Sequence, residues 1–141
     1  MSQGWLLDTN IVSEWVKPRP DAGVVRWLEE TDEERVFLSV VTLAEIRFGV
    51  ERLALGRRRT GLDRWLREEL PARFEARILS VELEVADACG RLLARARQLG
   101  RGLGAMDALI AATCLARSLV LATRNLADFE ALGIELYSPF S

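Results

Sequence analysis

Three carboxylates of this 141-residue chain stand in apolar segments, where a charge is costly to bury. Asp8 follows a short apolar run, Glu45 lies within residues 40–46, and Asp107 lies within residues 105–112. Each needs a cation, hydrogen bonds or a raised pKa, because a dehydrated charge without a partner is unstable. Clustered carboxylates repel unless a hard cation neutralises them, and Mg²⁺ or Mn²⁺ prefers oxygen ligands. A site that only binds a metal would satisfy the three acids. Because the chain has no histidine and no reactive-looking cysteine, metal-activated water attacking a phosphodiester is the more economical hypothesis.

Each acid also has a purely structural interpretation. Asp8 could cap the helix that follows it, and Asp107 could favour the start of its own helix through the macrodipole. Glu45 could pair with Arg47, Arg52 or another arginine. The three together are harder to explain in this way, because all stand at the end of a strand or the start of a helix. A doubly wound sheet gathers such positions on one edge.

A fourth contributor is expected after the strand predicted at Leu119–Thr123, which should lie parallel to the first strand. Asn125 offers a neutral oxygen ligand there, and Asp128 offers a charged one three residues later. A turn in which either side chain caps a short helix is the alternative. We therefore predict Asn125 as a member of the catalytic set and Asp128 as a metal ligand.

Composition narrows the chemistry further. The chain has no histidine, which excludes a Ser-His-Asp triad and the usual zinc sites. Its two cysteines, Cys89 and Cys114, lie in apolar helical segments and are predicted to be buried thiols. A formal net charge of −2 provides no overall basic footprint for nucleic acid. The run Arg57–Arg59 could still contact RNA phosphates, but a solvated turn is the alternative. Lys17 and Arg19 follow Asp8 closely and could flank the site.

The remaining patterns concern packing and location. Trp15, Trp27 and Trp65 fall at helical spacing with leucines and are predicted to be core or interface residues rather than base-stacking platforms. No signal peptide and no apolar run of membrane length is evident, so we expect a cytoplasmic protein without a membrane span.

Short apolar runs alternate with helical patterns along the chain. The runs predict five strands, at Leu6–Asp8, Val36–Leu38, Ile78–Leu79, Leu119–Thr123 and Ile134–Tyr137. The helices are expected at Asn10–Val16, after Asp21, from Ser39 or Thr42 to Gly56, around Leu62–Leu70 up to Pro71, at Val81–Leu99 and at Ala105–Arg117. This alternation predicts an α/β fold, with one domain over residues 1–141 and a mostly parallel central sheet covered by helices on both faces.

Four short motifs occur in a fixed order: Leu7–Asn10, Thr42–Glu45, Asp107–Ala112 and Thr123–Asn125. With them the chain resembles the PIN-domain ribonucleases. It is similar, more narrowly, to the VapC toxins of VapBC toxin–antitoxin pairs, including the FitB-like branch. The segment Asp8–Glu14 and the ending Tyr137–Phe140 carry the likeness to that branch. The resemblance implies a PIN-like domain over essentially the whole chain.

The resemblance also implies roles for individual residues. Asp8, Glu45 and Asp107 match the family's acidic residues that hold Mg²⁺ or Mn²⁺, with Asp8 and Asp107 as the direct ligands. Thr9 matches the hydroxyl residue that steadies the first aspartate. Asn125 stands where some relatives carry a fourth aspartate, which leaves a second metal open and gives Asp128 a compensating role.

The expected activity is that of a Mg²⁺-dependent ribonuclease acting as the toxin of a type II toxin–antitoxin system. Asp8 and Asp107 would hold the metal that orients and acidifies a water, while Glu45 would accept its proton or complete the metal shell. The resemblance implies a homodimer and a VapB-type antitoxin whose arm covers the acidic pocket. Two alternatives stay open: a PIN-like module that binds RNA or protein without catalysis, and a metal-dependent DNA nuclease using the same carboxylates.

Overall fold

One five-stranded parallel sheet forms the centre of the computed structural model, which describes residues 3–141. The strands are β1 (Gly4–Leu7), β2 (Val36–Ser39), β3 (Ile78–Leu79), β4 (Leu119–Ala122) and β5 (Leu136–Tyr137). Their order across the sheet is β3-β2-β1-β4-β5, and every neighbouring pair is parallel. The predicted α/β fold and its parallel sheet are confirmed, and β1 lies at the middle of the sheet.

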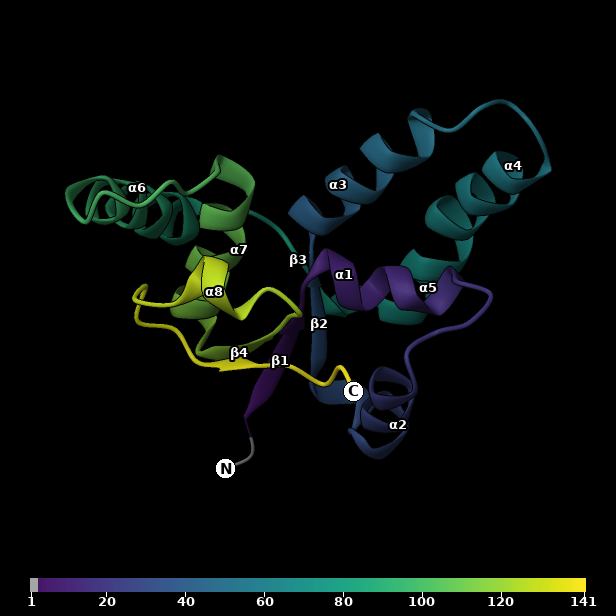
Figure 1. Ribbon diagram of the computed structural model, residues 1–141, viewed down its shortest axis with the longest axis horizontal. Helices are drawn as coiled ribbons and strands as arrows, with labels where there is room; N and C mark the ends of the chain where they lie inside the picture. Colours follow the sequence, from purple (N-terminus) through teal and green to yellow (C-terminus); the bar gives the residue numbers. More distant parts are fainter. Residues whose placement is uncertain (1–2) are drawn as a thin grey trace.

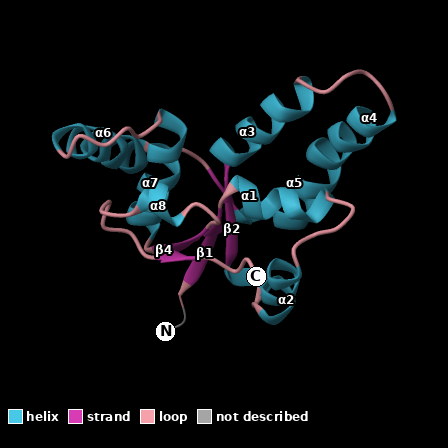
Figure 2. Cartoon of the chain, in the orientation of Figure 1, coloured by secondary structure: helices cyan, strands magenta, loops and turns pink. Residues whose placement is uncertain are grey.

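Helices cover both faces of this sheet (Figure 1). They are α1 (Thr9–Val12, extended by a 3₁₀ turn at Ser13–Val16), α2 (Ala22–Glu30), α3 (Val40–Glu51), α4 (Arg57–Arg64), α5 (Leu70–Phe74), α6 (Leu83–Gln98), α7 (Ala105–Arg117) and α8 (Leu126–Phe129). In Figure 2, α6, α7 and α8 lie on one side of the sheet, and α1, α2 and α5 lie on the other. The secondary-structure elements alternate much as predicted, and α7 has the predicted bounds.

The strands divide their side chains between two hydrophobic clusters, because successive residues of a strand point to opposite faces. Leu6 of β1 and Leu121 of β4 are buried in the cluster that contains α6 and α7. Leu7 and Ala122 are buried in the other cluster, against α1, α2 and α5. Since β1 and β4 are buried on both faces, each reads as a continuous apolar run that ends abruptly at its first polar residue.

Two helix starts follow from side-chain capping that the sequence indicated. Asp21 accepts a hydrogen bond from the amide of Val24 at 3.1 Å and begins α2. Ser39 accepts one from the amide of Val41 at 3.0 Å and begins α3, which settles the choice between Ser39 and Thr42. α3 therefore starts directly at the carboxyl edge of β2.

The prediction around Gly56 was wrong. α3 already ends at Glu51, and the carbonyl of Gly56 accepts the amide of Thr60 at 3.0 Å, so Gly56 begins α4 rather than ending α3. The predicted basic turn Arg57–Arg59 is consequently the first turn of α4. This change matters for the site, because the helical turn sets the side of α4 from which each arginine projects.

The helix was also expected to stop at Pro71, but it continues to Phe74. Between α4 and α5 the chain forms a π-helical segment, Trp65–Glu69. A proline inside a helix lacks an amide hydrogen and its ring collides with the carbonyl four residues earlier, and a π-helical turn widens the helix at that place. The wide turn explains how α4 and α5 form one nearly continuous arm.

Within residues 3–141, no helix combines the length and apolar character needed to cross a membrane. Both cysteines are buried and free, as predicted.

Candidate metal-dependent nuclease site

Asp8 follows β1 at the carboxyl edge of the sheet, and its own amide still donates to the carbonyl of Ala122 at 2.9 Å. The side chain is 5% exposed. Its Oδ1 accepts the amide of Thr9 at 2.8 Å, and its Oδ2 accepts the hydroxyl of Thr123 at 2.8 Å and the amide group of Asn10 at 3.3 Å. Asp8 therefore caps α1, as the structural interpretation predicted, while its carboxylate is held in one orientation.

Thr123 is fully buried directly after β4 and connects several parts of this edge. Its Oγ1 accepts a hydrogen bond from the side chain of Asn10 at 3.3 Å and one from the amide of Asn125 at 3.0 Å. Because both of those groups are donors and the carboxylate of Asp8 only accepts, the Thr123 hydroxyl proton has to point at Asp8. Asn10 in turn accepts the amide of Arg124 at 3.0 Å through its Oδ1.

Glu45 lies on α3, half-buried, and its Oε1 accepts the hydroxyl of Thr9 at 2.6 Å. Thr9 steadies the first aspartate through its backbone amide, which binds Asp8, while its hydroxyl binds Glu45. The predicted arginine partners of Glu45 are wrong within residues 3–141. Arg47 pairs with Glu51 and Asp63, and Arg52 stacks on Phe48. One threonine thus orients two carboxylates from different elements.

Asp107 lies in the first turn of α7, half-buried, where the helix macrodipole favours a negative charge. Burial raises the pKa of its carboxyl group, and the charges of Asp8, Glu45 and Asp128 raise it further. Burial also raises the pKa of Asp8, against the lowering effect of its hydrogen bonds from Thr123, Thr9 and Asn10. In the described part of the chain, no lysine or arginine forms an ion pair with any of these four acids.

Asn125 and Asp128 occupy the start of α8. The backbone amide of Asn125 reaches Thr123, and Asn125 stands at the N-cap position of the short helix α8, as the alternative had it, but its side chain makes no capping hydrogen bond. Asp128 is exposed in the first turn of α8, and its charge raises the pKa of both Asp8 and Asp107. The structure thus brings Asp8, Glu45, Asp107 and Asp128 to one edge, with Asn125 beside them.

These acids fit an open site for Mg²⁺ or Mn²⁺ rather than a closed cage. Among residues 3–141, no three acidic, histidine or cysteine side chains converge closely enough to surround an ion. Mg²⁺ is commonly held by one or two carboxylates, with waters and substrate phosphates completing its shell. Asp8 and Asp107, one buried and one half-buried and both without a cation partner, have the oxygen chemistry that such a site uses.

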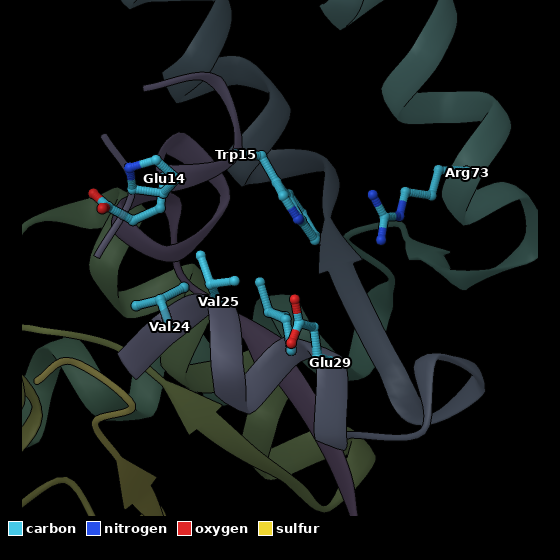
Figure 3. Close-up of a pocket in the computed structure, with 8 residues that line it drawn as sticks. Glu14, Trp15, Val24, Val25, Glu29 and Arg73 are labelled. Atoms are coloured by element: carbon cyan, nitrogen blue, oxygen red, sulfur yellow. The ribbon is translucent and has the colours of Figure 1, made fainter. Parts of the chain in front are cut away.

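A separate cavity of about 220 Å³ lies away from the acids, between α2 and the 3₁₀ turn after α1 (Figure 3). Trp15 and the apolar side chains of Val24 and Val25 form its walls, with Glu29 and Arg73 at its rim. None of the four carboxylates lines it. The guanidinium of Arg73 lies 4.7 Å from the ring centre of Trp15 and pairs with Glu33, so the charge of Arg73 beside this cavity is already engaged within the protein.

Sequence reasoning assigned no role to Thr123 or Asn10, although both complete the site. The available signal was the position of Thr123 directly after a buried strand, at the same edge as Asp8. In the register of the parallel pair, Leu7 faces Ala122, so the next residue of each strand falls at the same level.

Residues 5–134 match the sequence profile of the PIN domain. The chain belongs to the PIN-domain family. It is 36% identical over 135 residues to the VapC ribonuclease Y4jK of Sinorhizobium fredii, covering 96% of both chains. The crystal structure of FitAcB from Neisseria gonorrhoeae matches with a TM-score of 0.89 and 36% identity, covering 96% of this chain and 97% of that one.

A solved structure with lower sequence identity has the same fold. It is VapBC-5 of Mycobacterium tuberculosis, a member of the VapBC family of toxin-antitoxin systems, with a TM-score of 0.68 and 26% identity. The match covers 97% of this chain and 98% of that one. The resemblance to VapC toxins and to the FitB-like branch is therefore confirmed over nearly the full length of the chain.

Proposed function

We propose that this PIN-domain protein is a Mg²⁺-dependent endoribonuclease that hydrolyses RNA phosphodiester bonds. The observation that carries the proposal is the gathering of Asp8, Glu45 and Asp107 at one edge of the sheet, where hydrogen bonds orient two of them and no cation of the described chain neutralises them. The relative named a VapC ribonuclease supports RNA as the substrate. Mn²⁺ has the same ligand preference and is expected to replace Mg²⁺.

Asp8 and Asp107 are the residues that would hold the ion. When bound, Mg²⁺ supplies positive charge to the scissile phosphate and lowers the pKa of an attacking water. Thr123 keeps the Asp8 carboxylate from rotating by donating to Oδ2. Glu45, fixed by the hydroxyl of Thr9, accepts the proton of the attacking water. Asp128 adds negative charge at the open side, and Asn125 provides a neutral oxygen there.

The biological role we propose is that of the toxin in a type II toxin–antitoxin pair. Support comes from the likeness to VapBC-5, a member of such systems, and from the 36% identity to the protein in the FitAcB structure. The partner is a VapB-type antitoxin with an arm that covers the acidic pocket, and the toxin forms a homodimer in the cytoplasm. Co-purification with the product of an adjacent small gene checks the pairing.

The activity is tested by incubating the purified protein with RNA and with DNA, in Mg²⁺, in Mn²⁺ and in chelator. We expect RNA cleavage with either ion, none in chelator, and a loss of about 10²-fold or more for Asp8→Asn, because the variant removes a charge that holds the ion. Circular dichroism verifies that the variant is folded.

Four results would overturn the proposal. Wild-type cleavage by Asp8→Asn, or cleavage in chelator, removes the metal mechanism. Cleavage of DNA alone makes the protein a DNA nuclease. RNA binding without cleavage under every condition makes it a binding module.

A further inference from the structure

A groove of about 330 Å³ begins at the acidic edge and runs between α3 and α4. Thr9 and Glu45, joined by the 2.6 Å hydrogen bond, line it at the acidic edge. Two cationic residues, Lys17 and Arg58, and the indole of Trp65 line it as well. In Figure 1, α3 and α4 lie side by side and are joined by a loop at their far end. The groove is thus continuous with the proposed catalytic site.

A second hollow, about 350 Å³, continues this groove away from the acids. The two share the side chains of Val16, Arg58, Leu62 and Trp65, and the second hollow adds Arg57. A strand lying along both would therefore pass from the acids over Trp65 and on to the first turn of α4.

We propose that this groove binds the single-stranded segment of RNA next to the scissile phosphate, with Arg58 contacting a backbone phosphate and Trp65 stacking on a base. The inference rests on the proposed ribonuclease activity and names the surface that holds its substrate. It gives a further role to the exposed part of Trp65, which packs against the core as predicted, and it takes up the phosphate contact that the sequence left open for Arg57–Arg59 beside a solvated turn.

The charge of Arg58 is available for a ligand. The arginines on α4 that lie outside the groove are engaged: Arg59 pairs with Glu51, and Arg64 pairs with Glu68. Within residues 3–141, Arg57 and Arg58 have neither a hydrogen bond nor an ion pair through their side chains, and both are exposed. Arginine binds phosphate through a planar fork of donors, so an unengaged arginine beside a nuclease site fits a backbone contact.

Lys17 lines the same groove from its other wall. Its ammonium group pairs with the carboxylate of Glu14, a residue that is 3% exposed. This pairing holds Lys17 at the mouth of the groove and partly neutralises it. Arg58 therefore contributes more of the positive potential in the groove than Lys17 does.

The groove suits a single strand better than a duplex. Its walls between the cations are apolar, from Ile46, Val50 and Leu62, and Trp65 is only half-buried among them. An aromatic face can stack on a base only when that base is unstacked from its neighbours, which single-stranded RNA permits and a duplex does not. A phosphate track beside an aromatic side chain is the usual arrangement of single-strand binding surfaces.

The test compares Arg58→Ala with Arg64→Ala, an exposed arginine on the same helix that does not line the groove. The probe is a short fluorescein-labelled single-stranded RNA of random sequence. Binding is followed by anisotropy in chelator at several salt concentrations, and cleavage of the same RNA in Mg²⁺ is measured separately. We expect Arg58→Ala to weaken binding about five- to tenfold and to lower the salt slope by about one, with KM raised and kcat little changed.

Trp65→Leu should weaken single-strand binding and leave the salt slope unchanged, and unlabelled duplex RNA should compete less well than single-stranded RNA. Arg64→Ala should behave as the wild type. The inference is overturned if the wild type cleaves RNA while Arg58→Ala and Arg64→Ala bind alike, and this result leaves the proposed function intact. It is also overturned if Arg58→Ala binds RNA normally but loses a co-purified antitoxin, since the groove then holds a protein segment. No RNA cleavage by the wild type would instead remove the proposed function.

Discussion

The hydroxyl of Thr123 donates to Oδ2 of Asp8 at 2.8 Å across 115 positions of sequence. Both residues are buried, and each directly follows one of the paired parallel strands β1 and β4. The side chain of Asn10 and the amide of Asn125 both donate to the same hydroxyl oxygen, so neither can accept the hydroxyl proton of Thr123. The carboxylate of Asp8 is the group that accepts it. Because β1 and β4 are paired, Thr123 lies beside Asp8 and orients the carboxylate that we propose as a metal ligand.

Replacing Thr123 by valine should keep the side-chain shape and remove this hydrogen bond. Partners that orient a ligand typically alter metal affinity by 10- to 100-fold, so we expect Mg²⁺ to bind about tenfold more weakly. Stability should fall by about 1–3 kcal/mol, because Asn10 and Asn125 lose their acceptor. Thr123→Ser retains the hydroxyl and serves as the control. A Mg²⁺ titration of the melting temperature measures both effects, and equal titrations for the valine and serine variants would contradict the orienting role.

Asp107→Asn should stabilise the metal-free protein at neutral pH. Burial and three neighbouring acids raise the pKa of Asp107, so its folded state binds a proton more tightly than the unfolded state does. Such a group favours folding below its unfolded pKa, and this advantage is lost as the pH rises through the folded pKa. The asparagine variant should therefore melt higher than the wild type at pH 7 in chelator, and the difference should shrink as the solution is acidified.

The control is Asp63→Asn, which should change the stability at neutral pH in the opposite direction and lower the melting temperature. Hydrogen bonds from Arg67 and Arg47 lower the pKa of Asp63, so its charge favours folding at neutral pH, and that contribution is lost at low pH. Thermal unfolding in chelator and in Mg²⁺ separates the cases. Mg²⁺ should raise the melting temperature of the wild type and of Asp63→Asn but not that of Asp107→Asn. A Mg²⁺ response in Asp107→Asn equal to that of the wild type would exclude Asp107 as a ligand.

The carboxylates could be found from sequence because their signal is local. Asp8 and Asp107 are charges next to residues that are otherwise apolar, and a short window shows this contrast. Thr123 has no such signal, since threonine is common in strands and its importance arises from a neighbouring strand more than a hundred residues away. Asn125 illustrates the same limit, because its backbone amide, not the side chain, enters the hydrogen-bond network.

Local helix-breaking signals predicted the wrong helix boundaries at two positions. Gly56 and Pro71 predicted ends of helices, yet Gly56 begins α4 and Pro71 lies inside α5. The π-helical segment before Pro71 removes the collision that the prediction relied on, and Leu66, Leu70 and Phe74 bury the arm against the core. The direction of Arg58 into the groove depends on this helix, which is why its role could not be read from the basic run alone.

Glu14→Gln should destabilise the protein at neutral pH and have little effect in acid. Burial opposes the charge of Glu14, but Lys17 and the amide of Asp21 outweigh it and lower its pKa. A lowered pKa means that the charge favours folding above the unfolded pKa and that this contribution is lost as the pH falls through the folded value. We expect a loss of about 1–2 kcal/mol at pH 7, close to the worth of a charged hydrogen bond. Urea unfolding at pH 7 and in acid measures it, and a loss independent of pH would contradict the account.

Cys114 should resist alkylation in the folded protein. Burial raises the pKa of its thiol to about 12, and the charge of Asp8 contributes to the rise. At pH 8 only about one thiol in 10⁴ is then ionised, and the thiolate is the reactive form. Iodoacetamide should therefore label Cys114 rapidly in guanidinium chloride and hardly at all in buffer, with Cys114→Ser identifying its contribution against Cys89. Fast labelling of the native protein would mean that α7 does not keep this thiol buried.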